Sequence, residues 1–260
     1  VHFRDPGLTH KEDFASGSAA AACGGVTCVL DMPNTLPPVS QGSLLEEKRR
    51  LIEGRSYVDF GLYGVIAAGG DLAASISRLS GLAQAGAIAF KLFLGPTTGD
   101  IRAPEVGELL PIFRTVARWD LPIVVHAEDR SVIEVAESQR RPSGSRDYRD
   151  LLASRPRFGE LLAVETAARL AQETGARVHI AHLALAEAVD IVRRYRREGV
   201  AISAETCPPY LFLSEEDAAR LGPAFKILPP VRSRQDQAAL WRGLRDGTIE
   251  VVATDHAPHL

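Results

Sequence analysis

The sequence predicts an α/β fold of alternating strands and helices, and it favours a closed (β/α)8 barrel that is truncated at both ends. Three observations support this prediction. Short apolar runs alternate along the chain with amphipathic stretches. The length of 260 residues suits one large domain of this kind. Residues that can bind metals or move protons follow several of the apolar runs, where the site of such a barrel forms.

The predicted strands are short and rich in β-branched or apolar residues, as strands covered on both faces should be. Seven runs fit this description: Thr27–Met32, Val58–Val65, Ile88–Phe93, Ile123–His126, Arg177–His182, Val200–Glu205 and Glu250–Thr254. An eighth strand would end at His2 and lie mostly before Val1. Because chemically active residues crowd both ends and no initiator Met is present, we expect the chain to be cut through its own active site.

Amphipathic helices are predicted between these strands. The predicted ranges are Lys11–Ala22, Leu44–Glu53, Leu72–Ala85, Val106–Arg118, Phe158–Thr174, Ala184–Arg197 and Arg234–Arg245. Glycines at positions 24, 25, 175 and 199 fall where helices should stop. The polar stretch Ser138–Arg155 is predicted to be a long loop or a short excursion.

Repeated βα units imply a parallel sheet within one domain that covers residues 1–260. An open doubly wound sheet and a closed barrel both fit the alternation, and the count of eight strands favours the barrel. The Gly-Pro-Thr-Thr-Gly stretch at 95–99 lacks the lysine and the spacing of a phosphate-binding loop.

The composition is that of an ordinary soluble globule, with 45% hydrophobic and 24% charged residues. A net charge of −3 gives no reason to expect nucleic acid or an anionic membrane as a partner. No apolar run reaches the roughly 18–20 residues that cross a bilayer. Cys23, Cys28 and Cys207 lack zinc-type spacing, so we expect reduced, buried thiols in a cytoplasmic protein.

Five residues that can bind metals lie at or near the ends of five predicted strands: His2, Lys91, His126, His182 and Asp255. Each has a structural alternative. His2 could be a frayed terminal residue, and Lys91 could snorkel from a strand end. His126 could be a satisfied core histidine, and Asp255 could be a helix N-cap. Together, five such residues at the catalytic end of a barrel favour a metal site.

The residue types in this set are imidazoles and oxygen donors without thiolates, which suit Zn²⁺ and related ions. Lys91 lies among apolar residues, and a lysine carbamate would give an anionic oxygen that can bridge two metals. Two metals about 3.5–4 Å apart could share a hydroxide. His179 and His182 lie three apart in a strand and point to opposite faces, so we assign only His182 to the site.

At these residues the sequence resembles the dihydroorotases of the amidohydrolase superfamily. The resemblance is carried by His2–Gly7, Thr9–Phe14, Asp31–Thr35 and Thr254–His259. Leu211–Ser214, Ser233–Asp236 and Ala239–Trp241 are similar to the dihydroorotase part of multifunctional pyrimidine-synthesis proteins. The resemblance implies a TIM barrel of the metal-dependent hydrolase type. It also implies the interconversion of N-carbamoyl-L-aspartate and L-dihydroorotate in de novo pyrimidine (UMP) biosynthesis.

The same resemblance implies a role for each of the five residues. His2 matches the second member of a His-x-His pair whose first member would precede Val1. Lys91 matches a carboxylated lysine that, with a hydroxide, bridges two Zn²⁺ ions. His126 and His182 match ligands of the second metal. Asp255 matches a ligand that also serves as general acid and base.

Substrate contacts follow from the resemblance as well. Arg4 and Asn34 match residues that hold the substrate carboxylate, His259 matches a further substrate contact, and Thr97 matches a threonine on a loop that closes over the substrate. The implied partners are a small-molecule substrate and either a second copy of the chain or an aspartate transcarbamoylase.

Two positions depart from the family pattern. Pro209 stands where a histidine is usual, and Leu228 stands where a polar substrate contact is common. Leu228 keeps open an allantoinase or a hydantoinase of the dihydropyrimidinase-like type. A non-catalytic dihydroorotase-like scaffold is the alternative from another class.

Overall fold

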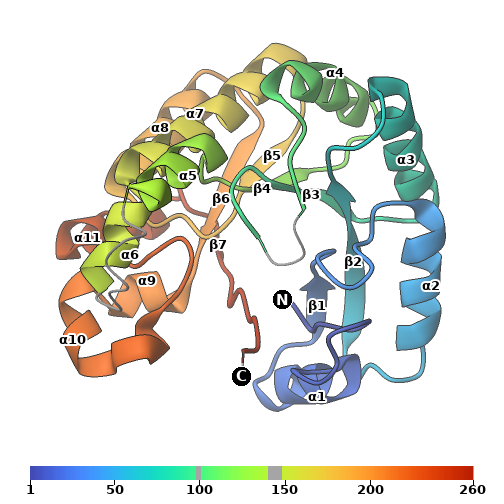
Figure 1. Ribbon diagram of the computed structural model, residues 1–260, viewed down its shortest axis with the longest axis horizontal. Coiled ribbons are helices and arrows are strands. Elements are labelled where there is room, and N and C mark those ends of the chain that lie inside the picture. Colours follow the sequence, from blue (N-terminus) through green and yellow to red (C-terminus); the bar gives the residue numbers. More distant parts are fainter. Residues whose placement is uncertain (98–100, 140–147, 260) are drawn as a thin grey trace. The chain divides into compact units, whose positions relative to one another are not determined.

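The computed structural model describes residues 1–97, 101–139 and 148–259, and Figure 1 shows their helices and strands. These residues form two compact units. The first unit comprises residues 1–124 together with the described residues from 255 onward, and the second unit comprises residues 125–254. The first unit is therefore discontinuous in sequence.

Three parallel strands form the sheet of the first unit in chain order. They are β1 (Cys28–Asp31), β2 (Asp59–Ile66) and β3 (Ala89–Phe93). The helices of this unit are α1 (Phe14–Cys23), α2 (Gly42–Ile52), α3 (Leu72–Gln84) and α4 (Val106–Ala117). Helices α2 and α3 pack against each other and against β2, as Figure 1 shows. Crossover helices of this kind are what parallel pairing requires.

The expected strand before His2 is not assigned as a strand, yet its backbone follows β1. The amino group of Val1 donates to the carbonyl of Leu30 at 3.0 Å, and the backbone N–H of Met32 donates to the carbonyl of Val1 at 2.9 Å. Phe3 packs edge-on against Phe14 of α1, with ring centroids 5.0 Å apart. These contacts hold the first residues of the chain against the end of β1.

A buried ion pair fixes the same segment from α2. Lys48 Nζ lies 2.6 Å from Asp31 Oδ2, and the two side chains are 2% and 0% exposed. Asp31 Oδ1 accepts a hydrogen bond from the backbone of Phe3 at 2.9 Å. Because Phe3 lies between His2 and Arg4, this pair restrains the backbone of both predicted site residues. Removing one partner of such a pair typically costs about 3–5 kcal/mol.

The second unit also contains parallel strands in chain order. Strand β4 (Ile123–His126) enters it from the first unit, and it is followed by β5 (Val178–Ile180), β6 (Ile202–Thr206) and β7 (Val251–Val252). Ala181 donates to the carbonyl of Val125 at 3.1 Å, which places the end of β5 beside β4.

Helices of the second unit pack on these strands and on each other, with α7 against β5 and α8 against β6. The longer helices are α5 (Arg130–Ser138), α7 (Arg157–Thr174), α8 (Ala186–Arg197) and α11 (Arg234–Arg245). The shorter ones are α6 (Tyr148–Ser154), α9 (Pro208–Phe212), α10 (Ala218–Leu221) and the 3-10 turns η1 (Glu215–Asp217) and η2 (Gly222–Phe225).

The predicted α/β class with parallel strand pairing is confirmed. Each of the seven predicted strands has an observed counterpart, and the last is shortened to Val251–Val252. The stretch Ser138–Arg155, predicted to be a long loop or a short excursion, carries α6 near its end, and residues 140–147 lie outside the described residues. Helices α5 and α9 were not predicted.

The cysteine prediction needs correction. Cys207 is buried, but Cys23 and Cys28 are exposed. Cys23 ends α1 and Cys28 begins β1, so both lie at element ends, where the flanking residues do not cover them. Among the helices that the structure describes, none combines the length and hydropathy needed to cross a bilayer.

Candidate active site

His2 lies at the centre of a hydrogen-bond chain that joins four predicted site residues in the first unit. His2 Nδ1 lies 2.7 Å from Asn34 Oδ1. On the other side of the ring, His2 Nε2 lies 3.3 Å from Asp255 Oδ1. Asn34 Nδ2 donates in turn to Thr97 Oγ1 at 3.4 Å. The sequence analysis predicted these residues as ligands or substrate contacts of one site, and the structure links them by these contacts.

The geometry around His2 suits a metal ion. With Asn34 Oδ1 as acceptor, His2 Nδ1 carries the proton and Nε2 directs its lone pair towards Asp255. Burial lowers the pKa of His2, and the nearby carboxylate of Asp255 opposes this effect. Two ligand atoms about 2.1 Å from a tetrahedral Zn²⁺ lie roughly 3.4 Å apart. The 3.3 Å separation of Nε2 from Asp255 Oδ1 matches that spacing.

Lys91 belongs to the same unit and is buried. It lies in β3 with 2% of its surface exposed, and its Nζ is 5.1 Å from the centroid of the Phe93 ring. Burial is the main cause of the lowered pKa of His2, and the charge of Lys91 also contributes to it. A buried ammonium near a metal-competent histidine is unfavourable. A carbamate on Nζ would replace that positive charge with an anionic oxygen donor.

A second pair of ligand-type atoms lies in the second unit. His126 Nδ1 and His182 Nε2 are 3.0 Å apart, with ring centroids 4.7 Å apart, and both side chains are buried. Among the residues that the structure describes, no group of three or more His, Cys, Asp or Glu side chains could hold a metal alone. In each unit, a pair of predicted ligands lies at a separation that fits two ligands of a zinc-type ion.

Backbone strain coincides with the predicted site. Arg4, His182 and Asp255 have φ angles of 62°, 42° and 43°. In the described part of the chain only one other non-glycine residue, Asp120, has a positive φ. Such conformations cost of order 1–3 kcal/mol and cluster at functional sites. Three of the four described non-glycine residues with a positive φ are thus residues that the sequence analysis selected.

The strained turn at His182 is held by hydrogen bonds on both sides. Ala181 donates to Val125 at 3.1 Å, and Leu183 donates to the carbonyl of Glu205 at 2.8 Å. Thr206 Oγ1 donates to the carbonyl of Leu183 at 2.9 Å. Strands β4 and β6 therefore fix the backbone that carries this histidine.

Arg4 is a buried cation with donors that no hydrogen bond satisfies. Its side chain lies in a residue that is 3% exposed, and its Nε and Nη1 atoms have no hydrogen-bond partner. Burial lowers the pKa of Arg4, and the charges of Asp31, Asp255 and Glu12 oppose that effect. Adjacent guanidinium donors of this kind can bind a carboxylate or a carbonyl of a ligand.

A buried carboxylate, Glu128, contacts His126. Its Oε2 lies 2.9 Å from His126 Nε2 and accepts a hydrogen bond from Arg155 Nη1 at 2.6 Å. Burial by itself raises the pKa of Glu128, but the His126 hydrogen bond and the charges of Arg155 and Arg232 outweigh it, and the pKa is lowered. The sequence analysis missed Glu128, although its position two residues after a candidate ligand was a usable signal.

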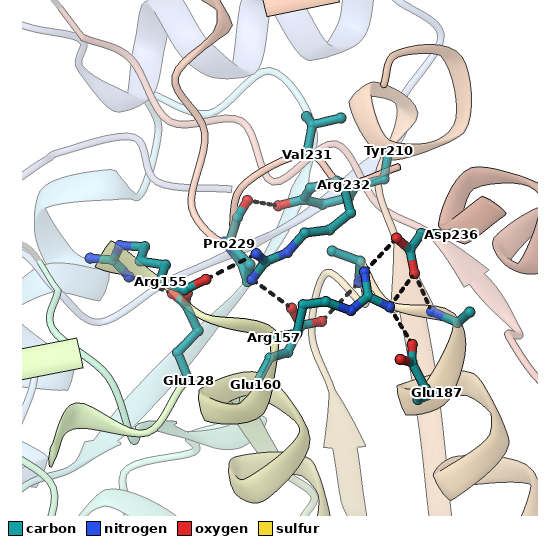
Figure 2. A network of polar contacts seen from close by, with 12 residues as sticks. Glu128, Arg155, Arg157, Glu160, Glu187, Tyr210, Pro229, Val231, Arg232 and Asp236 are labelled. Atoms are coloured by element: carbon teal, nitrogen blue, oxygen red, sulfur yellow. Dashed lines mark hydrogen bonds and ion pairs between the residues drawn. The ribbon is translucent and has the colours of Figure 1, made fainter. Parts of the chain in front are cut away.

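Figure 2 shows that Glu128 and Arg155 belong to a larger network of polar contacts. Arg232 Nη1 donates to the carbonyl of Arg155 at 2.9 Å, and its Nη2 lies 3.5 Å from Glu160 Oε2. Glu160 Oε1 accepts from the backbone of Ala184 at 3.2 Å, two residues beyond His182. The network thus reaches from the side chain of His126 to the segment that follows His182.

A neighbouring ion pair joins three helices of the same unit. Arg157 of α7 binds both carboxylate oxygens of Asp236 in α11, at 2.7 and 2.9 Å. Asp236 Oδ1 also accepts from the backbone of Ala186, the first residue of α8. Arg157 contacts Glu187 as well (Figure 2).

Glu160 predicts a pH dependence of stability. Burial raises its pKa from 4.5 to about 7, against the charge of Arg232. The folded state therefore holds this proton more tightly than the unfolded state. Its stabilising effect is complete below pH 4.5 and is lost as the pH rises through about 7. The loss amounts to about 3 kcal/mol, at roughly 1.4 kcal/mol per pKa unit.

We expect Glu160→Gln to flatten this dependence. Urea unfolding of wild type and variant at pH 5 and pH 8 should show a larger gain for the variant at pH 8. The exposed Glu165→Gln variant is the control and should leave the pH dependence unchanged. Parallel stability curves for wild type and Glu160→Gln would contradict the raised pKa.

Other residues considered in the sequence analysis have separate surroundings. His179 Nδ1 lies 2.8 Å from Ser203 Oγ and its Nε2 3.2 Å from Glu205 Oε2, so β6 holds this ring. His259 is exposed in the first unit, and Leu228 is half-buried in the second. Asp31 and Lys48, which restrain the backbone at Phe3, were not predicted as supporting residues.

The fold of the chain is shared with solved cyclic-amide hydrolases. The L-hydantoinase (dihydropyrimidinase) from Arthrobacter aurescens matches with a TM-score of 0.93 and 33% identity, over 100% of this chain and 57% of that one. A D-hydantoinase structure matches with a TM-score of 0.89 and 26% identity, again over 100% of this chain. No protein-family model matches the sequence.

Similar sequences carry names from the same class of enzyme. The allantoinase of Rubrobacter xylanophilus is 38% identical over 260 residues, which cover 99% of this chain and 56% of the relative. The dihydroorotase of Halobacterium salinarum is 39% identical over 263 residues, or 100% of this chain and 57% of the relative. These relatives are hydrolases that act on cyclic amides, and the chain spans little more than half of their length.

Proposed function

We propose that the chain carries the metal site of a cyclic amidohydrolase that opens a ring of the allantoin or hydantoin type. The observation that carries this proposal is the pairing of predicted ligands at metal-ligand separations, His2 with Asp255 and His126 with His182. We assign Lys91, as a carbamate, to the ligand set of the first unit, with His2 and Asp255. We also propose that the parallel βα units belong to a (β/α)8 barrel, as the strand count predicts.

The chemistry that we infer is hydrolysis of a ring amide. Bound Zn²⁺ would polarise the ring carbonyl and lower the pKa of water. Asp255 would take the proton of the attacking water and return it to the departing amide nitrogen. Arg4 would bind a polar group of the substrate through the donors that have no protein partner. Thr97, next to Asn34, would lie beside the same substrate.

Two observations favour an allantoin or hydantoin ring over dihydroorotate. Similar proteins named allantoinase include those of Rubrobacter xylanophilus and Deinococcus radiodurans, each 38% identical, and the hydantoinase structures share the fold. Asn34, which the resemblance assigns to the substrate carboxylate, also contacts His2. We propose that it orients this ligand, a role that does not require a carboxylate on the substrate.

Dihydroorotase is the second candidate, and Arg4 is the observation that favours it. A buried guanidinium with two atoms that lack hydrogen-bond partners suits the exocyclic carboxylate of dihydroorotate. Dihydroorotases from Methanosarcina mazei and Halobacterium salinarum are 36% and 39% identical to the chain.

A turnover assay with the zinc-loaded protein distinguishes these functions. Allantoin, a 5-substituted hydantoin and L-dihydroorotate are compared under the same conditions by kcat/KM. We expect ring opening of allantoin or the hydantoin to be at least about tenfold faster than that of dihydroorotate, since tenfold is 1.4 kcal/mol of transition-state binding. Faster turnover of dihydroorotate would select the second candidate. Zinc binding without any turnover would indicate a scaffold.

A further inference from the structure

We propose that Glu128 is a positioning residue that determines which ring nitrogen of His126 faces the metal. Arg155 holds the carboxylate in place for this purpose. The inference rests on the metal site of the proposed function, and it concerns a residue that is not itself a ligand.

The hydrogen bond between Glu128 and His126 sets the tautomer. Glu128 Oε2 lies 2.9 Å from His126 Nε2, and an ionised carboxylate can only accept. His126 Nε2 therefore carries the proton, and Nδ1 keeps its lone pair. Nδ1 is the atom that lies 3.0 Å from His182 Nε2. The two atoms that face each other are thus the ligand atoms that we assign, Nδ1 of His126 and Nε2 of His182.

The surroundings of Glu128 keep its carboxylate fixed. Arg155 Nη1 donates to the same Oε2 at 2.6 Å, and the two side chains are 6% and 2% exposed for Arg155 and Glu128. Arg232 in turn holds the carbonyl of Arg155 at 2.9 Å, as Figure 2 shows. Water cannot replace these contacts in a buried place. Partners that orient a metal-binding histidine typically change metal affinity 10–100-fold when they are removed.

A purely structural ion pair in the same unit supplies a matched control. Asp236 is 2% exposed and is bound by Arg157 through both oxygens, whereas Arg155 binds Glu128 through Oε2. Its contacts lie with Arg157, Ser233 and Ala186, away from the two histidine rings. Asp236→Asn should lower stability without changing the tautomer of His126.

The test combines a spectroscopic measurement with a metal titration. Wild type, Glu128→Leu, Glu128→Gln and Asp236→Asn are labelled with ¹⁵N-histidine, stripped of metal and examined by long-range ¹H–¹⁵N NMR. Zn²⁺ affinity is measured by competition with a chelator. We expect the Nε2–H tautomer of His126 in wild type. In Glu128→Leu we expect this tautomer to be lost and the Zn²⁺ affinity to fall about 10–100-fold. Glu128→Gln keeps an acceptor and should largely restore both.

A second variant guards against misfolding, because Glu128→Leu leaves Arg155 buried without its carboxylate. The double variant Glu128→Leu/Arg155→Met removes both charges and should show the same loss of tautomer and affinity. An Nδ1–H tautomer in wild type, or unchanged zinc binding in the two leucine variants, would overturn this role alone. A wild type that keeps the tautomer but binds no zinc would refute the proposed metal site and this role with it.

Discussion

Asp255→Asn is expected to reduce turnover by roughly 10²–10⁴-fold, the range that general acid–base catalysis contributes, while zinc stays bound. An asparagine oxygen can still face the metal, but an amide cannot take a proton from water and pass it to the leaving nitrogen. In the structure Asp255 Oδ1 lies 3.3 Å from His2 Nε2, and its backbone has a φ of 43°. The measurement is kcat on the preferred cyclic amide together with zinc content.

Asp120→Asn is the matched control for this change. Asp120 is the fourth non-glycine residue with a positive φ in the described part of the chain, at 53°, so both substitutions test the same backbone conformation. Asparagine tolerates that conformation. The control should keep full activity. Near-normal turnover of Asp255→Asn would refute the acid–base role, whereas equal losses in both variants would indicate a folding defect.

Lys91→Ala is expected to abolish activity together with zinc binding. Lys91 is 2% exposed in β3, and its charge acts on His2, so we infer that a carbamate on Nζ supplies an anionic ligand. Alanine removes that ligand and leaves a space in which a small carboxylic acid could act instead. Activity should therefore return in part when acetate or propionate is added with zinc.

Incorporation of ¹³C-labelled CO₂ tests the carbamate directly. A carbamate carbon resonance is expected in zinc-loaded wild type and not in Lys91→Ala. The exposed Lys226→Ala variant is the control and should retain the resonance, the zinc and the activity. Wild-type zinc content and turnover in Lys91→Ala would rule out the carbamate.

Much of the fold could be predicted because local patterns determine it. The strand over 123–126 was predicted at its observed bounds, since it is a short apolar run that ends in a polar residue. The helix over 234–245 was also predicted at its observed bounds, because Ser233 and Asp236 form a capping box at its start. In contrast, α5 begins at Arg130, and its N-cap Asp129 lies three residues after His126 in a segment considered only for its chemistry.

The candidate site was predicted less completely because its geometry depends on contacts between distant segments. Sequence placed His2, Asn34, Thr97 and Asp255 in one site but gave no sign that Asn34 contacts a histidine. Glu128 is buried against Arg155, which lies 27 residues away between α6 and α7. No local sequence pattern indicates this contact. The positive φ angles of His182 and Asp255 could not be predicted from the sequence either, because neither residue type requires a positive φ.

The discontinuity of the first unit has a consequence for the timing of assembly. His256 contacts Glu12 across 244 positions of sequence, and Asp255 reaches His2 over a similar interval. Contacts of such long range form late, because the chain must first close a large loop. On the ribosome, His2 would wait for Asp255 until synthesis has passed the second unit. A nascent chain would thus bring these two residues together only after the second unit has been made.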